Sequence, residues 1–419
     1  MSGVIGGPVV ATVATRLLIV AGGLVSSVLT ARWLSPSGRG EYFLIVTLAQ
    51  TLAQFGNFGL QSSNTYFVAR DRSLRGPLLA NSIWIAVGVG GVGSLIVILA
   101  LEMMGAASGG GRLWFAALLA PATLFFMFGT NLLVGLKRIG TYNKFQLGSN
   151  YGVLLCLVVA AALGAGPRGF VAASTLGWTA VSVALVVALR RGSSASLGFN
   201  RPVFREGFRY SLNAYIVTLC GFLVLRSNVF ILSALRGPEQ VGYYSIASQI
   251  ADIMGILPQS MALVLFPTLI TTEEGRLRTT LRHMMIVGIL LAAGCGIVGI
   301  LAEPFVRAVF GQKFLAAVPL LRWMLPGVFF VGLTSVVSQY LAASGFPASL
   351  VAVWMAGSAA AAGLGWVLIP GSSGAGAAIA VSLTHAGIFI AVLGLSVAHS
   401  RRHLAESRIT NIVPDGAIA

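Results

Sequence analysis

The sequence predicts an all-α polytopic membrane protein with about 12 transmembrane helices in two pseudo-symmetric six-helix halves. Three observations predict this fold. Of the 419 residues, 57% are hydrophobic and only 9% are charged, whereas soluble domains carry roughly 25% charged residues. Apolar stretches of about 20 residues, the length that crosses a bilayer, follow one another along the chain. A loop motif and the polar pattern after it also occur twice, about 200 residues apart.

Twelve apolar stretches, separated by short connections, are the candidate spans. They lie near residues 8–33, 42–69, 78–101, 113–136, 145–165, 169–190, 209–235, 241–271, 284–302, 315–344, 348–370 and 374–398. Arg16 interrupts the first stretch and no basic segment precedes it, so we expect a transmembrane helix there and not a secretory signal peptide.

The basic residues are distributed unevenly between the two sides of the predicted membrane. The formal net charge is +16. Of 27 Lys and Arg residues, 17 fall in one set of alternating loops and the C-terminal tail, for example Arg70 and Arg209. Eight fall on the opposite side, Arg39 among them, and the remaining two, Arg16 and Arg226, lie within spans. By the positive-inside rule, we expect a multi-pass protein of the plasma (inner) membrane with both termini in the cytoplasm. The basicity then reflects topology and attraction to membrane lipids, and we expect no nucleic-acid partner.

The loop motif marks an internal repeat. Residues 36–42 and 238–244 share a proline, a glycine and a tyrosine at an offset of 202. Since six helices is an even number, both halves would enter the membrane in the same direction, related by a pseudo-twofold axis along its normal. We expect an N-terminal half at 1–190, a cytoplasmic linker at 191–208, and a C-terminal half at 209–398. The remaining residues form a cytoplasmic tail, 399–419.

A polar stripe follows each copy of the loop. In the first copy the polar residues recur every three or four positions, which places them on one helix face. They are Thr47, Gln50, Gln54, Asn57, Gln61 and Asn64. The second copy carries Ser245, Gln249, Asp252 and Gln259. A polar stripe on a membrane helix faces a protein interior or a water-filled cavity, because lipid offers it no hydrogen bonds.

Three charged residues within spans are candidates for chemistry: Arg16, Arg226 and Asp252. Guanidinium groups bind phosphate bidentately and keep their charge, so two arginines predict an anionic, phosphate-bearing substrate. Asp252 is a candidate proton or cation site. Three other interpretations stay open. Arg16 snorkels to the headgroups, Arg226 and Asp252 neutralise each other, or the amides only join helices. The three cysteines show no metal-ligand spacing, and we expect no metal or other cofactor.

The chain resembles the polysaccharide-biosynthesis flippases (Wzx type) of the multidrug/oligosaccharidyl-lipid/polysaccharide (MOP) exporter superfamily. In that family the loop after the first helix reads like Leu-Gly-Pro-x-x-x-Gly-x-Tyr, and here it is Leu-Ser-Pro-Ser-Gly-Arg-Gly-Glu-Tyr at 34–42. The family's Asp-Phe-Gly-Leu segment corresponds to Asn-Phe-Gly-Leu at 57–60. The resemblance implies a MOP/MATE-like bundle with a central cationic cavity lined by helices 1, 2, 7 and 8. It also implies that Arg16 and Arg226 meet a diphosphate.

These observations together predict a transporter and not an enzyme. The expected function is to flip a polyprenyl-diphosphate-linked oligosaccharide across the plasma membrane for cell-surface polysaccharide synthesis, by alternating access. Gln50, Gln54, Asn57, Gln61, Gln249 and Gln259 would line the path of the sugars, and Asp252 would couple movement to an ion gradient. The expected partners are the lipid-linked glycan, membrane lipids and a polysaccharide polymerase. The alternative function is a cation-coupled small-molecule (MATE-like) exporter, which would need Asp252 and not the arginines.

Overall fold

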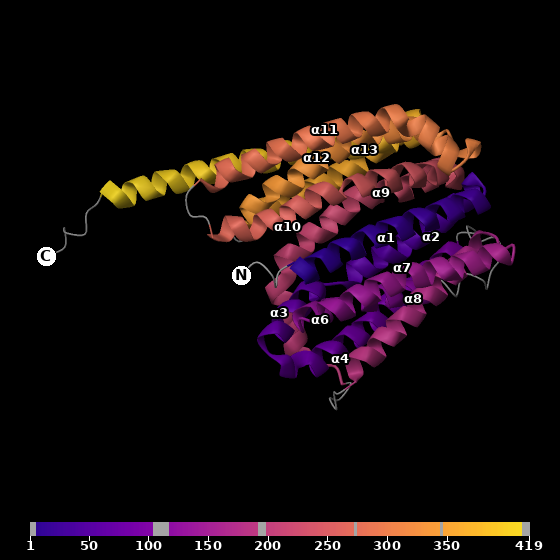
Figure 1. Ribbon diagram of the computed structural model, residues 1–419, viewed down its shortest axis with the longest axis horizontal. Coiled ribbons are helices and arrows are strands. Elements are labelled where there is room, and N and C mark those ends of the chain that lie inside the picture. The colour runs from indigo at the N-terminus through magenta and orange to yellow at the C-terminus, as the bar shows by residue number, and fades with distance from the viewer. Residues whose placement is uncertain (1–5, 104–116, 192–197, 272–274, 344–346, 413–419) are drawn as a thin grey trace. The chain divides into compact units, whose positions relative to one another are not determined.

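The computed structural model describes residues 6–103, 117–191, 198–271, 275–343 and 347–412, and these residues form helices and no strands (Figure 1). The helices are α1 Gly6–Trp33, α2 Pro36–Gly56, α3 Leu60–Arg70, η1 Arg72–Leu74, α4 Arg75–Ile85, η2 Ala86–Gly91, α5 Val92–Met103, α6 Leu119–Gly135, α7 Ile139–Ala162, α8 Pro167–Arg190, α9 Arg201–Met254, α10 Ile256–Thr271, α11 Arg276–Val309, η4 Gln312–Phe314, α12 Ala317–Ala343 and α13 Ala348–Ile412. Of the two elements labelled η early in the chain, η1 is a 3₁₀ turn and η2 is a π-helical turn.

The described helices account for the twelve predicted spans. Eight helical runs are apolar and long enough to cross a membrane, and the bent pair α2–α3 makes a ninth. The shorter apolar helix α6, of 17 residues, lies within the fourth predicted stretch. Two runs each contain two spans, because α9 is broken at Gly237 (φ 79°, ψ 178°) and α13 at Ser373 (φ 51°, ψ −131°). The all-α polytopic fold predicted from hydropathy is therefore confirmed.

A break between α2 and α3 divides the first polar stripe. Phe58 and Gly59 have left-handed backbone conformations, with φ values of 47° and 75°, and the two helices meet at a bend of 50°. The prediction that residues 47–64 form one stripe on one helix face is therefore wrong beyond Asn57. Asn64, on α3, instead donates a hydrogen bond to Ser82 Oγ on α4 at 3.0 Å.

The chain divides into two compact units. The first comprises Met1–Phe222, Ser233–Ser245 and Val306–Leu315, and the second comprises Leu223–Leu232, Ile246–Phe305 and Ala316–Ala419. The predicted halves, 1–190 and 209–398, follow the sequence repeat and not these contacts, and they stay a prediction.

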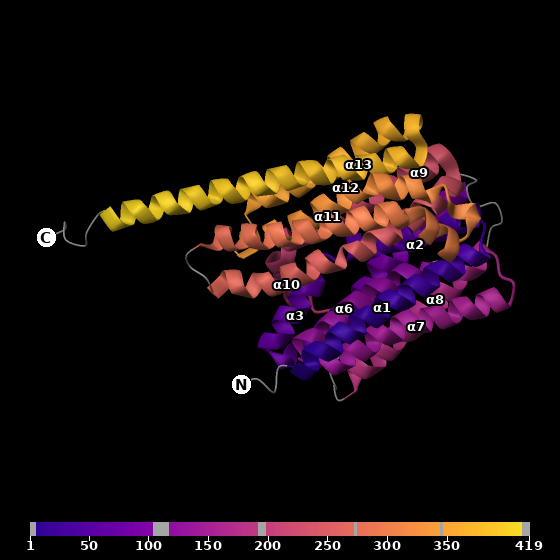
Figure 2. The ribbon, with the colours of Figure 1, turned by 45° about the horizontal axis from the view of Figure 1, so that its top comes forward.

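Each unit has its own apolar core. In the first unit, Phe128 and Leu132 of α6 pack with Leu185 and Leu189 of α8, and all four are fully buried. Helices α6, α7 and α8 contact one another there (Figure 1). In the second unit, α12 lies along α13 (Figure 2), and both contribute side chains to a buried cluster around Val337. Both cores are built from long apolar helices, as hydropathy predicts.

The two repeated loops pack against each other within the first unit. A Cβ atom added to Gly40 would lie 1.7 Å from the carbonyl oxygen of Pro238, and one added to Gly242 would lie 2.0 Å from that of Pro36. Residues 36 and 40 correspond to residues 238 and 242 in the repeat, at an offset of 202. The two contacts, Gly40 with Pro238 and Gly242 with Pro36, are therefore equivalent under the repeat. This reciprocity is what a local pseudo-twofold axis produces.

Arg39 lies inside this contact and is not a solvated loop residue. Ser35 caps α2 by accepting a hydrogen bond from Gly38 N at 3.1 Å, and Pro36 takes the first helical position, as both residue types prefer. Arg39 therefore falls in the first turn of α2, where it is only 2% exposed. Its guanidinium group donates to Ser27 O at 2.7 Å and to Ser245 Oγ at 2.9 Å. Arg39, counted from the sequence among the basic residues of the opposite side, thus lies within a helix, because α2 begins six residues earlier than hydropathy predicts.

Basic side chains cap two helix ends beside these loops. Lys313 Nζ donates to the carbonyl oxygens of Arg32 and Leu34, at 3.1 and 2.7 Å, at the end of α1. Arg32 Nε donates in turn to Val309 O, the last residue of α11, at 2.8 Å. Such donors satisfy the unpaired carbonyl groups at a helix C-terminus. Partial burial and the charge of Arg32 lower the pKa of Lys313.

Candidate functional site

Arg226 and Asp252 form an ion pair within the second unit. Arg226 precedes the break in α9 and Asp252 follows it, and the guanidinium nitrogen lies 2.7 Å from the carboxylate oxygen. Their side chains are 18% and 44% exposed, respectively. Of the interpretations left open by the sequence, the structure shows the pairing of these two charges. A phosphate that binds Arg226 must therefore compete with a carboxylate that remains partly accessible.

Arg16 is placed differently. Its side chain is exposed on α1, in the first unit. That position accommodates both snorkelling to the headgroups and contact with a ligand. The predicted convergence of Arg16 with Arg226 stays a prediction, as does the assignment of a diphosphate to them.

The amide side chains of the first stripe occupy unlike environments. Gln50 is exposed and Gln61 half-buried, whereas Gln54 and Asn57 are 7% and 0% exposed. Asn57 Oδ1 accepts a hydrogen bond from Gln61 N at 3.3 Å. Among the described residues, the Gln54 Nε2 and Asn57 Nδ2 donors have no protein partner. Because buried donors are rarely left unpaired, these two point to water or a ligand at the break after α2.

The amides of the second stripe lie in the second unit. Gln249 is half-buried and Gln259 is exposed. Neither is held in the core, so both are accessible enough to meet a solute. A shared path for the sugars along both stripes stays a prediction.

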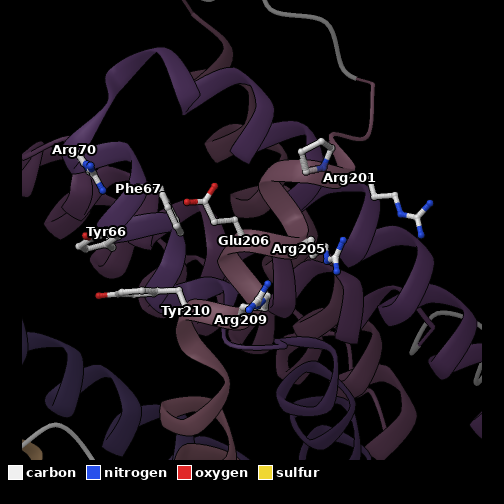
Figure 3. A pocket seen from close by; sticks show the side chains of 9 residues that line it. Tyr66, Phe67, Arg70, Arg201, Arg205, Glu206, Arg209 and Tyr210 are labelled. Carbon is white, nitrogen blue, oxygen red and sulfur yellow. The ribbon is translucent and has the colours of Figure 1, made fainter.

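A cavity of about 1,080 Å³ lies in the first unit, where α3 ends and α9 begins. Four arginines and three aromatic residues dominate its lining (Figure 3). We call it the arginine cavity. It is lined by Tyr66, Phe67, Arg70, Arg201, Pro202, Arg205, Glu206, Arg209 and Tyr210.

The start of α9 is fixed by a pair of amides. Asn81 Nδ2 donates to Asn200 O at 2.9 Å, and Asn200 N donates to Asn81 Oδ1 at 2.7 Å. Asn200 Oδ1 then accepts a hydrogen bond from Val203 N at 3.1 Å, which is the usual role of an N-cap. The first turns of α9 are therefore anchored to α4. This fixes the backbone positions from which the arginines of these turns extend.

The four guanidinium groups of the arginine cavity are available to a ligand. All four side chains are exposed, and the described part of the chain places no carboxylate within ion-pairing distance of any of them. Two tyrosines stack beside them: the rings of Tyr66 and Tyr210 have centroids 4.4 Å apart and an interplanar angle of 18°. The cavity therefore combines positive charge with an exposed aromatic face.

From the sequence we expected the basic loop residues, including these arginines, to reflect topology and attraction to membrane lipids. The four arginines are Arg70, Arg201, Arg205 and Arg209. Their spacing held a further signal, because Arg201, Arg205 and Arg209 recur every four residues and so share one helix face. A tyrosine next to Arg209 and another close to Arg70 accompany them. The spacing of these charges, and not only their number, therefore indicates a cluster.

Comparison with known proteins places the chain in a family. Residues 9–273 match the family described as polysaccharide biosynthesis protein. The chain belongs to this family. The match covers both copies of the repeated loop and ends after α10. No curated protein matches the chain significantly.

Solved structures extend the likeness to nearly the whole fold. The lipid II flippase MurJ, in an inward closed conformation, superposes with a TM-score of 0.73 and 14% identity over 93% of this chain and 87% of that one. A multidrug resistance MATE family transporter of the MOP superfamily, inward-facing, gives 0.72 and 14% over 90% and 93%. A MOP superfamily transporter from Pyrococcus furiosus, in a study of reversed binding-pocket polarity, gives 0.64 and 16% over 94% and 97%. The chain thus has the fold of MOP superfamily transporters.

Proposed function

We propose that the protein flips a polyprenyl-diphosphate-linked oligosaccharide across the plasma membrane by alternating access, for the synthesis of surface polysaccharide. Membership of the polysaccharide biosynthesis family supports a glycan substrate. The observation that carries the proposal is an arginine, Arg226, placed in a long apolar helical run and held by an accessible carboxylate. An ionised group at such a position is a functional residue by default. The protein acts as a transporter and not as an enzyme.

In this proposal the diphosphate exchanges places with Asp252. A diphosphate offers several charged oxygens and can bind a guanidinium group bidentately, whereas Asp252 approaches through one oxygen at 2.7 Å. When Asp252 binds a proton or a cation, its hold on Arg226 weakens and the diphosphate binds there. When Asp252 ionises again, it forms the ion pair with Arg226 once more and the substrate leaves. Because the ion and the diphosphate bind together and leave together in this exchange, the ion and the lipid would cross the membrane in the same direction.

In this proposal the amide side chains line the path of the sugars. Gln54 and Asn57 have buried donors without protein partners among the described residues, and sugar hydroxyl groups are suitable acceptors. Gln249 and Gln259 lie near Asp252 in sequence and are accessible. Arg16 would supply a second positive charge for the diphosphate. The cytoplasmic orientation of both termini and a polysaccharide polymerase as partner belong to the same proposal.

The test uses a strain depleted of the protein and rescued at equal expression. The rescuing chains are wild type, Arg226→Ala, and Arg278→Ala as a matched control that removes an exposed arginine of the second unit. Surface polysaccharide and polyprenyl-diphosphate-linked glycan are measured by mass spectrometry. We expect Arg226→Ala alone to lose surface polymer and accumulate the lipid-linked precursor. If depletion changes neither quantity, the protein does not flip this substrate.

One observation favours the second candidate function, a cation-coupled exporter of small molecules. The Asp252 side chain is more exposed than that of Arg226, 44% against 18%, and exposed membrane carboxylates attract organic cations. Export of a cationic dye from vesicles would then be abolished by Asp252→Asn and preserved in Arg226→Ala. Equal dye retention with and without the protein would eliminate this function.

A further inference from the structure

We propose that the arginine cavity is a second anion site, which receives the sugar-diphosphate headgroup of the lipid-linked substrate before that headgroup reaches Arg226. The class of ligand rests on the proposed function. The site itself rests on the charges, rings and volume that the first unit brings together between α3 and α9.

The arrangement of the arginines is unfavourable until an anion binds. Arg201, Arg205 and Arg209 lie in the first turns of α9, where the helix dipole presents its positive end. They are also spaced four residues apart, so that neighbouring like charges repel. Arg70, at the end of α3, adds a fourth guanidinium group from another helix. A bound diphosphate would relieve both unfavourable interactions.

The aromatic residues indicate that the ligand is more than a phosphate. Tyr66 and Tyr210 are stacked and remain 40% and 54% exposed. Phe67 meets Tyr210 edge to face, with ring centroids 5.8 Å apart, and so supports the stack from the buried side. A flat apolar surface beside cations suits a sugar ring, whose C–H groups lie against an aromatic face while its diphosphate meets the guanidinium groups.

Glu206 also indicates that the ligand is more than a phosphate. Its carboxylate lies among the arginines and aromatic rings that line the cavity (Figure 3). An ionised carboxylate only accepts hydrogen bonds, so it repels a bare phosphate and binds a donor. Sugar hydroxyl groups are donors. A cavity that holds both arginines and a glutamate is therefore complementary to a sugar diphosphate, in which an anion and hydroxyl groups are joined.

The volume agrees with a headgroup of this size. Pockets for drug-sized molecules measure about 300–1,000 Å³, and the arginine cavity measures about 1,080 Å³. It is too large for an inorganic ion alone. By the distribution of basic residues, the cavity also lies on the predicted cytoplasmic side, where a lipid-linked glycan would be loaded.

The experiment measures headgroup binding to the full-length protein in nanodiscs of phosphatidylcholine, by native mass spectrometry. Three probes are titrated: undecaprenyl-diphosphate-linked N-acetylglucosamine, undecaprenyl phosphate and phosphatidylglycerol. The variant is Arg205→Ala/Arg209→Ala. The matched control is Arg190→Ala/Arg191→Ala, which removes the same charge from the same predicted side but outside the cavity. A second variant, Glu206→Gln, tests the contact with the sugar and preserves all four arginines.

We expect the double cavity variant to bind the sugar-diphosphate probe at least 10-fold more weakly, and the control to bind it as wild type does. Glu206→Gln should weaken binding of that probe and strengthen binding of undecaprenyl phosphate. If the cavity variant and the control lose the same affinity, or if phosphatidylglycerol binding falls as much as probe binding, the arginines attract anionic lipid in general and the proposal is wrong.

Failure of this inference differs from failure of the proposed function. If Arg226→Ala blocks surface polysaccharide while the cavity variant binds the probe normally, flipping stands and the second site does not. If the cavity variant loses the probe but depletion of the protein leaves surface polysaccharide unchanged, the site exists in a protein with another task.

Discussion

The reciprocal loop contact predicts a large effect from a single added methyl group. In Gly40→Ala the new Cβ would lie 1.7 Å from Pro238 O, and contacts below 3.0 Å are essentially never observed. The two loops must therefore separate by at least 1.3 Å, the difference between these two distances. The obstacle is a backbone oxygen, so no side-chain rotation relieves it. Overpacking of this kind destabilises a protein by about 1–3 kcal/mol.

The control is Gly148→Ala, within α7, where an added Cβ meets nothing within 4 Å. Alanine there should stabilise the helix by about 0.5–1 kcal/mol. The assay is the midpoint of thermal aggregation in detergent, followed by size-exclusion chromatography. We expect Gly40→Ala to lower this midpoint and Gly148→Ala to preserve or raise it. Adding Gly242→Ala to Gly40→Ala should lower it by less than the sum of the two single effects, because one separation of the loops relieves both clashes. Equal midpoints for Gly40→Ala and Gly148→Ala would refute the contact.

Three further predictions concern single side chains. Arg39→Lys keeps the charge but loses the planar fork that reaches several acceptors, and should cost about 1.5–3 kcal/mol; a thermal midpoint equal to that of wild type would contradict the buried network. Gly59→Ala places a Cβ at φ 75° and 2.4 Å from Ser211 Oγ. Combining it with Ser211→Gly should remove the contacts with the Ser211 side chain, leaving a tight 3.1 Å approach to the backbone oxygen of residue 211 and a backbone strain of about 1–2 kcal/mol. Full recovery of the midpoint would therefore exclude strain. Asp252→Asn releases Arg226, so undecaprenyl diphosphate in nanodiscs should bind several-fold more tightly while surface polymer falls. Unchanged affinity would exclude the exchange of partners.

Hydropathy located the spans because a helix that crosses the bilayer must be apolar over about 20 consecutive residues. The twelve predicted stretches coincide with helices in the described residues, apart from short breaks such as that at Phe58 and Gly59. The two longest helices divide where the sequence places Gly237 and Ser373. Residue identity also revealed the repeat, since a proline, a glycine and a tyrosine recur at one offset. Such features follow from local chemistry and need no knowledge of tertiary contacts.

What the sequence did not reveal depends on backbone angles and on tertiary neighbours. The bend at Phe58 and Gly59 divides a regular pattern of amides. It was not predicted, because a glycine within a helical pattern does not by itself indicate a positive φ. Arg39 was counted among the basic residues of the opposite side, although Ser35 and Pro36 together are a helix-start signal that would have placed it in a first turn. The Arg226–Asp252 pair was one of the interpretations left open, and the sequence could not select it because the two residues lie 26 positions apart, a separation that no helical periodicity predicts.

The π-helical turn η2, Ala86–Gly91, has a consequence for how this family varies in length. A π turn holds one more residue than an α turn, because its hydrogen bonds reach one position further. The turn contains Gly88, Gly90 and Gly91, and a Cβ on Gly90 would lie 3.0 Å from Pro121 Cα. Removing a single residue here would restore an α turn and leave α4 and α5 presenting the same faces. We therefore expect relatives whose chains are one residue shorter at this position and otherwise in register.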